Sequence, residues 1–139
     1  MWKICICCFA AAIIHLNVIN LKLCLAWDAP DLSGYLQTAP WTCGPAVLRA
    51  ALTFYGIETT EEEVANLAGT DLSGTTLYGL RQAALAYGLE AVGERWNWVR
   101  LEQEKHPVIA FVRDNHYVVV LGAKDGDVTV FDPAIGQII

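Results

Sequence analysis

Cys43 is the first residue in this chain whose type and position could do chemistry. It is the only cysteine beyond residue 24, and Gly44-Pro45 directly after it is typical of a helix start. A thiol attacks a carbonyl only as the thiolate, and a free cysteine, with a pKa of about 8.5, is mostly protonated at neutral pH. The N-terminal end of a helix favours a nearby anion. Cys43 is therefore a candidate nucleophile, and a buried packing thiol is the alternative that its position alone leaves open.

A nucleophilic thiol needs a base, and His116 is the best-placed histidine. His15 lies in an apolar N-terminal stretch and His106 in a charged turn, whereas His116 begins a β-branched run. The Asp-Gly pair at 125–126, between two such runs, predicts a β-hairpin. In every register that this turn allows, Asp132 lies opposite His116 or within two positions of it. An even offset places both side chains on one face, where the carboxylate would orient the imidazole.

Gln37 is a candidate for the group that would stabilise the oxyanion. Its side-chain amide and the backbone N–H of Cys43 would form a two-donor oxyanion hole. Gly44 would let a substrate backbone approach closely, and Trp41 and Asn115 flank the catalytic candidates in the chain, so these three are candidate substrate-binding residues. Each residue alone has an ordinary structural explanation. Together they favour a cysteine hydrolase, with a catalytically silent binding module and a thiol amidase or transpeptidase as the alternatives.

The surrounding pattern predicts the elements that must position these residues. An apolar stripe from Pro45 to Gly56 predicts a helix, and the capping box Thr60–Glu63 opens another. Period-two, β-branched segments dominate the second half. The expected helices span 45–56, 61–68 and 77–87, a turn or short helix 97–105, and strands 89–94, 108–112, 116–121 and 128–131. Helices followed by an antiparallel sheet indicate an α+β fold.

The first 27 residues read as a hydrophobic leader. Lys3 precedes an apolar run over residues 4–26 that ends at Leu25-Ala26, which predicts a signal peptide or an N-terminal membrane anchor over 1–27. Both alternatives place the domain, residues 28–139, outside the cytoplasm, either secreted or periplasmic or anchored through residues 4–26. A buried first helix of a soluble domain is the remaining interpretation.

Composition limits the partners and cofactors. The 139 residues suffice for one domain, and residues 28–139 hold seven basic and fifteen acidic residues, a net charge of −8. Such an acidic domain argues against nucleic acid or an anionic membrane surface as a partner. Cys43 has no second cysteine for a disulfide and no cluster of metal ligands beside it, so neither a metal nor a cofactor is expected. Trp96 and Trp98 either pack or line a substrate groove.

Three stretches together resemble the peptidase C39 family: QTAPWTCGPAVLRAALTFYG, TTLYGLRQAALAYGLEA and HPVIAFVRDNHYVVVLGAKDGDVTVFDPAIG. The resemblance covers residues 36–136 and rests on the Cys-Gly-Pro helix start, the Asn-His-Tyr-Val-Val strand and the Asp-Pro-Ala-x-Gly turn. It implies a papain-like fold, with N-terminal helices packed on an antiparallel sheet, and a Cys/His/Asp triad with a Gln oxyanion donor. By matching motif, these roles fall on Cys43, His116, Asp132 and Gln37.

Family members of the best-known kind head ABC transporters and cut leader peptides after a Gly-Gly pair. This sequence departs from them because the chain contains no ABC transporter domain, its leader predicts an extracytoplasmic site, and Thr42 stands where an acidic residue is common. The family also continues with more sheet after the Asp-Pro turn, so a C-terminally shortened domain is expected. The resemblance implies a stand-alone cysteine peptidase that cleaves a peptide or protein, with small residues such as Gly-Gly at the cut.

Overall fold

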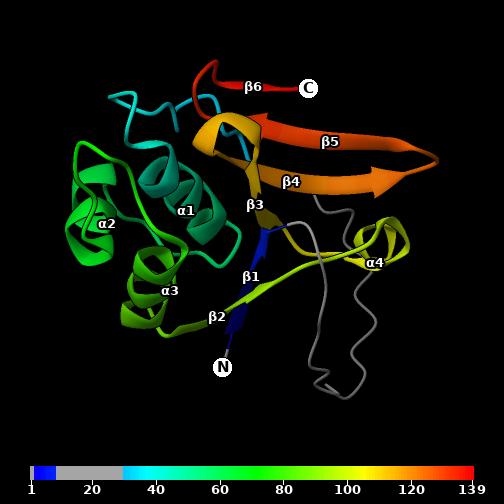
Figure 1. Cartoon of the computed structure of the whole chain (residues 1–139), viewed down its shortest axis with the longest axis horizontal. Helices are drawn as coiled ribbons and strands as arrows, with labels where there is room; N and C mark the ends of the chain where they lie inside the picture. The colour runs from blue at the N-terminus through cyan, green and yellow to red at the C-terminus, as the bar shows by residue number, and fades with distance from the viewer. Residues whose placement is uncertain (1, 9–29) are drawn as a thin grey trace.

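The computed structural model describes residues 2–8 and 30–139 (Figure 1). The helices are α1 (Cys43–Thr53), α2 (Glu61–Ala68), α3 (Leu77–Ala86) and α4 (Trp98–Gln103), with a 3-10 turn over Arg113–Asn115. The strands are β1 (Trp2–Cys8), β2 (Leu89–Glu94), β3 (Val108–Val112), β4 (His116–Lys124), β5 (Asp127–Asp132) and β6 (Gln137–Ile138). Every helix and strand expected from the sequence is present, and the α+β fold is confirmed.

Local capping signals set the helix ends that the sequence predicted. The Thr60 hydroxyl accepts a hydrogen bond from the Glu63 N–H and begins α2, and Gly69 ends this helix in the left-handed conformation with φ 63°. The Thr76 hydroxyl accepts from the Gly79 N–H at the start of α3. These caps satisfy backbone donors that a helix start leaves unpaired, so the boundaries follow from a few residues.

The strands form one sheet in the order β2-β1-β3-β4-β5-β6. The pairs from β3 to β6 are antiparallel. Helices α1, α2 and α3 gather on one side of the sheet, while α4 lies on the other side beside β3 and β4 (Figure 1). The site candidates therefore come from two layers, the α1 end of the helical layer and the β4–β5 hairpin of the sheet.

Alternate residues of β4 supply two apolar clusters. Tyr117 and Val119 pack into the main core with α1, α2 and α3. Val118 and Val120 pack into a second cluster, which includes Trp96 before α4. Because successive strand residues point to opposite faces, β4 anchors both layers, and its first residue is held by well-packed neighbours.

β1 is the element that the sequence did not predict. It runs parallel to both of its neighbours, with Ile6 paired to Gly93 of β2 and to Ile109 of β3. A short apolar run cannot be assigned to a helix or a buried strand by periodicity alone, so the sequence pattern places residues 4–8 in the predicted leader. The sheet is mixed as a result, rather than wholly antiparallel.

The remainder of the predicted leader, residues 9–29, lies outside the described residues. Within residues 2–8 and 30–139, the structure has no helix with the length and apolar character needed to cross a bilayer. The signal peptide or membrane anchor over 1–27 stays a prediction.

A proline in β1 tests whether residues 2–8 complete the sheet. We expect Ile6→Pro in the full chain to lower the free energy of unfolding by about 1–3 kcal/mol, because it removes a ladder donor and leaves a backbone acceptor unpaired. Urea denaturation measures the change. Ile6→Val keeps the backbone hydrogen bonds and is the control; equal stability of the proline variant and wild type would contradict the placement of β1.

Candidate active site

The thiol of Cys43 lies at the first residue of α1. Its side chain is 5% exposed and is a free cysteine. Thr42, the preceding residue, fixes the chain on entry to the helix: its hydroxyl accepts from the Ala39 N–H and donates to the Ala39 carbonyl, both at 3.0 Å. The thiol thus lies at the N-terminal end of α1, directly after a turn that is closed by these two hydrogen bonds.

Cys43 opens onto a hollow on the helical side of the sheet. Trp41 and Asn115, two of the candidate substrate-binding residues, line it, and Tyr117 forms part of its wall. Asn115 has φ 54°, a left-handed conformation that asparagine tolerates better than most residues. The rest of the wall comes from Pro40, residues 72–77 and Phe111.

Gly44 is not among the residues that line this hollow and instead lies against Thr75. A Cβ atom at Gly44 would meet Thr75 Cβ at 2.8 Å and Thr75 Oγ1 at 2.9 Å. The Thr75 carbonyl accepts a hydrogen bond of 2.9 Å from the Tyr117 hydroxyl, so this segment is fixed to β4. Gly44 allows the close approach of the chain's own segment 72–77, and its contact with a substrate stays a prediction.

His116 and Asp132 meet across the β4–β5 hairpin. Val119 pairs with Phe131, and the next position in this register sets Asp132 opposite Val118, two residues from His116. The His116 Nε2–H donates to Asp132 Oδ1 at 2.8 Å, and the two side chains are 24% and 21% exposed. This contact orients the imidazole and leaves Nδ1 as its other nitrogen.

Asp132 also holds its own turn. The same Oδ1 atom accepts from the Ala134 N–H at 2.8 Å. Two donors on one carboxylate oxygen fix the direction of the side chain. The predicted turn residues Asp125 and Gly126, with φ 53° and 96°, close the other end of the hairpin.

Gln37 is held by its backbone and by its side chain. Its N–H donates to the Pro133 carbonyl at 3.0 Å, next to Asp132. Its Nε2 donates to the Ala39 carbonyl at 3.0 Å. A side-chain amide carries two N–H donors, of which this bond uses one, and the Oε1 atom of the same amide is buried with no hydrogen bond in the described part of the chain.

The structure therefore brings the candidates together in two pairs. The imidazole of His116 is joined to Asp132. Gln37 is joined to the start of α1 because the Ala39 carbonyl also accepts from the Thr42 N–H at 3.1 Å. Within the described part of the chain, no hydrogen bond links the Cys43 thiol to His116, although the hollow beside the thiol includes the residues on both sides of that histidine.

Sequence reasoning missed Glu61. It lies in the acidic first turn of α2, yet it is only 8% exposed and contacts the loop that contains Gln37. The cap Thr60 and the three consecutive glutamates gave no sign that one carboxylate points inward. A glutamate at the first position of a helix is usually exposed. Its burial here becomes visible only when the packing of α2 against the loop at Thr38 is known.

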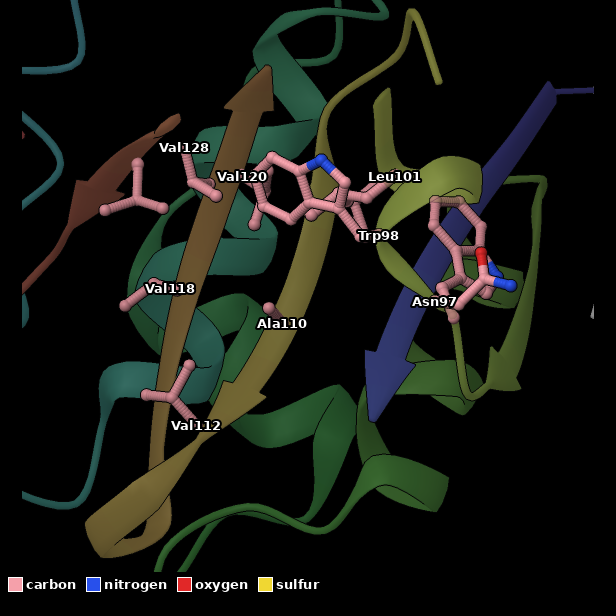
Figure 2. Close-up of a pocket in the computed structure, with 11 residues that line it drawn as sticks. Asn97, Trp98, Leu101, Ala110, Val112, Val118, Val120 and Val128 are labelled. Carbon is pink, nitrogen blue, oxygen red and sulfur yellow. The ribbon is translucent and has the colours of Figure 1, made fainter. Parts of the chain in front are cut away.

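A second hollow lies on the other side of the sheet. Figure 2 shows Val118, Val120 and Val128 of the hairpin facing it together with Trp98 and Leu101 of α4. Trp96 also lines it but is only 4% exposed, and its indole N–H donates to Glu94 Oε2 at 3.2 Å. The packing interpretation holds for Trp96, whereas Trp98 is 37% exposed and lines this hollow, and its contact with a substrate stays a prediction.

Among residues 2–8 and 30–139, no group of three or more His, Cys, Asp or Glu side chains is arranged to hold a metal ion.

Comparison with known proteins identifies the family. Residues 33–139 match the Peptidase C39 family, and the chain belongs to it. An uncharacterized protein of Methanothermobacter marburgensis is 44% identical over 105 residues, which cover 73% of this chain and 72% of that protein.

Two further relatives have a described activity. The lactococcin-G-processing and transport ATP-binding protein LagD of Lactococcus lactis is 34% identical over 108 residues, 69% of this chain but only 14% of LagD. A crystal structure of a double glycine motif protease from an AMS/PCAT transporter, in complex with the leader peptide, superposes with a TM-score of 0.68. It is 33% identical, and the match covers 75% of this chain and 76% of that one. This chain therefore has the fold of a C39 peptidase domain.

A methyl group at Gly44 tests how tightly the site is packed. We expect Gly44→Ala to lower the free energy of unfolding by about 1–3 kcal/mol, since Thr75 must move to admit it. This outcome opposes the gain that alanine normally brings inside a helix. Urea denaturation measures it. Gly93→Ala, where an added Cβ meets nothing within 4 Å, is the control; a stabilised Gly44→Ala variant would contradict the close approach.

Proposed function

We propose that this protein is a cysteine peptidase that uses Cys43 as nucleophile, His116 as acid and base, Asp132 to orient the imidazole and Gln37 as oxyanion donor. The observation that carries the proposal is the 2.8 Å contact between His116 and Asp132 in a C39 domain whose single cysteine of the described segment 30–139 begins α1. The proposed roles of all four residues agree with the family resemblance.

The proposed reaction proceeds in two stages. The Cys43 proton passes to His116 Nδ1, and the thiolate adds to the substrate carbonyl carbon. The Gln37 amide and the Cys43 N–H stabilise the oxyanion. His116 then gives its proton to the leaving amine as the C–N bond breaks, which leaves a thioester. Water, deprotonated by His116, attacks the thioester, and the acid product and the free thiol result.

Small residues on the acyl side of the cut fit the hollow beside Cys43. Trp41 is 39% exposed at its rim, and Tyr117 is fixed in its wall by its bond to Thr75. Rigid, bulky walls favour a substrate backbone with little side-chain volume. The solved relative cuts at a double glycine motif, and we extend this preference to the present chain.

Peptide cleavage tests the proposal directly. We expect the full chain to cleave a peptide after Gly-Gly with a higher kcat/KM than matched peptides with Gly-Ala or Leu-Leu at the same place. Cys43→Ala should abolish cleavage, and Gln37→Ala should lower kcat by about 100–1,000-fold through the lost oxyanion donor. Mass spectrometry of the products gives the site and rate.

Matched controls accompany that experiment. Gln82→Ala removes a surface amide that bonds only the Tyr78 hydroxyl within α3, and it should leave kcat unchanged. An added amine nucleophile distinguishes hydrolysis from amide transfer, because an amidase or transpeptidase would yield the amine adduct. A wild-type chain that cleaves none of the peptides, but binds them, would favour a silent binding module instead.

The rate of Cys43 alkylation tests the thiol–imidazole pair without any substrate. We expect iodoacetamide to modify Cys43 of the full chain rapidly below about pH 7, whereas His116→Ala should need the higher pH of a free thiol, about 8.5. Peptide mapping separates Cys43 from the other cysteines. His106→Ala, at an exposed histidine, is the control. Identical pH profiles of alkylation for wild type and His116→Ala would contradict a functional pair of Cys43 and His116.

A further inference from the structure

Glu61 is a buried carboxylate that the proposed mechanism does not use. It is the first residue of α2 and is 8% exposed, whereas its neighbours Glu62 and Glu63 are exposed. The start of a helix stabilises a carboxylate, but an exposed side chain would serve that purpose equally well. Burial of a charged group is costly unless specific hydrogen bonds offset the cost, so the contacts of Glu61 identify its role.

Both of those contacts go to Thr38, the residue after Gln37. Glu61 Oε1 accepts from the Thr38 N–H at 3.1 Å and from the Thr38 hydroxyl at 2.7 Å. The other oxygen, Oε2, is buried and has no hydrogen bond in the described structure. Glu61 Oε1 thus clamps Thr38, an exposed loop residue, by binding both its backbone N–H and its hydroxyl.

This clamp fixes Gln37 from one side while Pro133 fixes it from the other. The Gln37 N–H donates to the Pro133 carbonyl, and the Gln37 amide donates to the Ala39 carbonyl. Thr38, the residue between Gln37 and Ala39, has its own N–H bound to Glu61. Release of Thr38 would free the peptide unit that links these two anchors, and the direction of the amide would no longer be set.

We propose that Glu61 is a positioning residue for the Gln37 oxyanion donor; this inference rests on the proposed function. Glu61 touches neither the thiol nor the imidazole. Through Thr38, it helps to fix the direction of the Gln37 side-chain amide. This direction matters because an oxyanion donor is effective only within hydrogen-bonding distance of the developing charge. Its effect should fall on the chemical step and not on the reactivity of the thiol.

Two assays on the full chain separate these effects. Peptide hydrolysis requires the oxyanion donor, whereas alkylation of Cys43 by iodoacetamide forms no oxyanion. We expect Glu61→Ala to lower kcat by about 10–100-fold, the scale of a catalytic group displaced by about 1 Å, with KM and the alkylation rate within about twofold of wild type. A role in stability alone would reduce both activities together as the folded fraction falls.

Two variants define the requirement for an acceptor. Glu61→Gln keeps a carbonyl oxygen that can accept from Thr38, and it should restore most of kcat. Glu62→Ala removes an exposed first-turn charge from the same helix and should match wild type. If Glu61→Ala does not fold, as judged by circular dichroism and urea denaturation, Thr38→Val supplies the test. It removes the hydroxyl bond at an exposed position and should lower kcat with unchanged alkylation.

The outcomes distinguish this inference from the proposed function. An active wild type with an equally active Glu61→Ala variant overturns the inference alone, as does a Glu61→Gln variant no better than Glu61→Ala. Parallel losses of hydrolysis and alkylation overturn it in favour of a structural role. A wild-type chain as inactive as Cys43→Ala overturns the proposed function, and the inference falls with it.

Discussion

The register of the β4–β5 hairpin is the constraint on which the candidate site depends. It places Asp132 two positions from His116 on the same face, where Oδ1 reaches Nε2 at 2.8 Å. A slip of one residue would send one of the two side chains to the opposite face of the sheet. The Asp125-Gly126 turn and the buried pair of Val119 with Phe131 hold this register. The contact of the His116 imidazole with Asp132 thus depends on the register of the two strands, which is fixed in part by the turn at the far end of the hairpin.

The loop before α1 connects this sheet half of the site to the helical half. Gln37 is bonded to Pro133, beside the carboxylate that orients His116, and its amide is bonded to Ala39, within the turn that precedes Cys43. A displacement of the hairpin would therefore reach the loop through one backbone hydrogen bond. Gln37 and His116 are thereby connected through hydrogen bonds to Pro133 and Asp132, although they come from segments that are distant in the sequence.

Much of this arrangement could be predicted from the sequence because it rests on local signals. Capping threonines, the Asp-Gly turn and β-branched runs act over a few residues, and they located α2, the hairpin and the pair His116 and Asp132. The inward side chain of Glu61 and the parallel strand β1 could not be predicted in this way. Each depends on contact with a segment far away in the chain, Thr38 in one case and strands β2 and β3 in the other.

The position of β1 between β2 and β3 has a consequence for how the chain folds. Its partners are residues 89–94 and 108–111, so β1 pairs with segments that lie far later in the sequence. Contacts between distant segments close large loops and slow folding. Strand Trp2–Cys8 can pair with β2 first, but its pairing stays incomplete until β3 has been synthesised. Over that interval an apolar strand with free backbone groups is available to chaperones, to export factors or to another nascent chain.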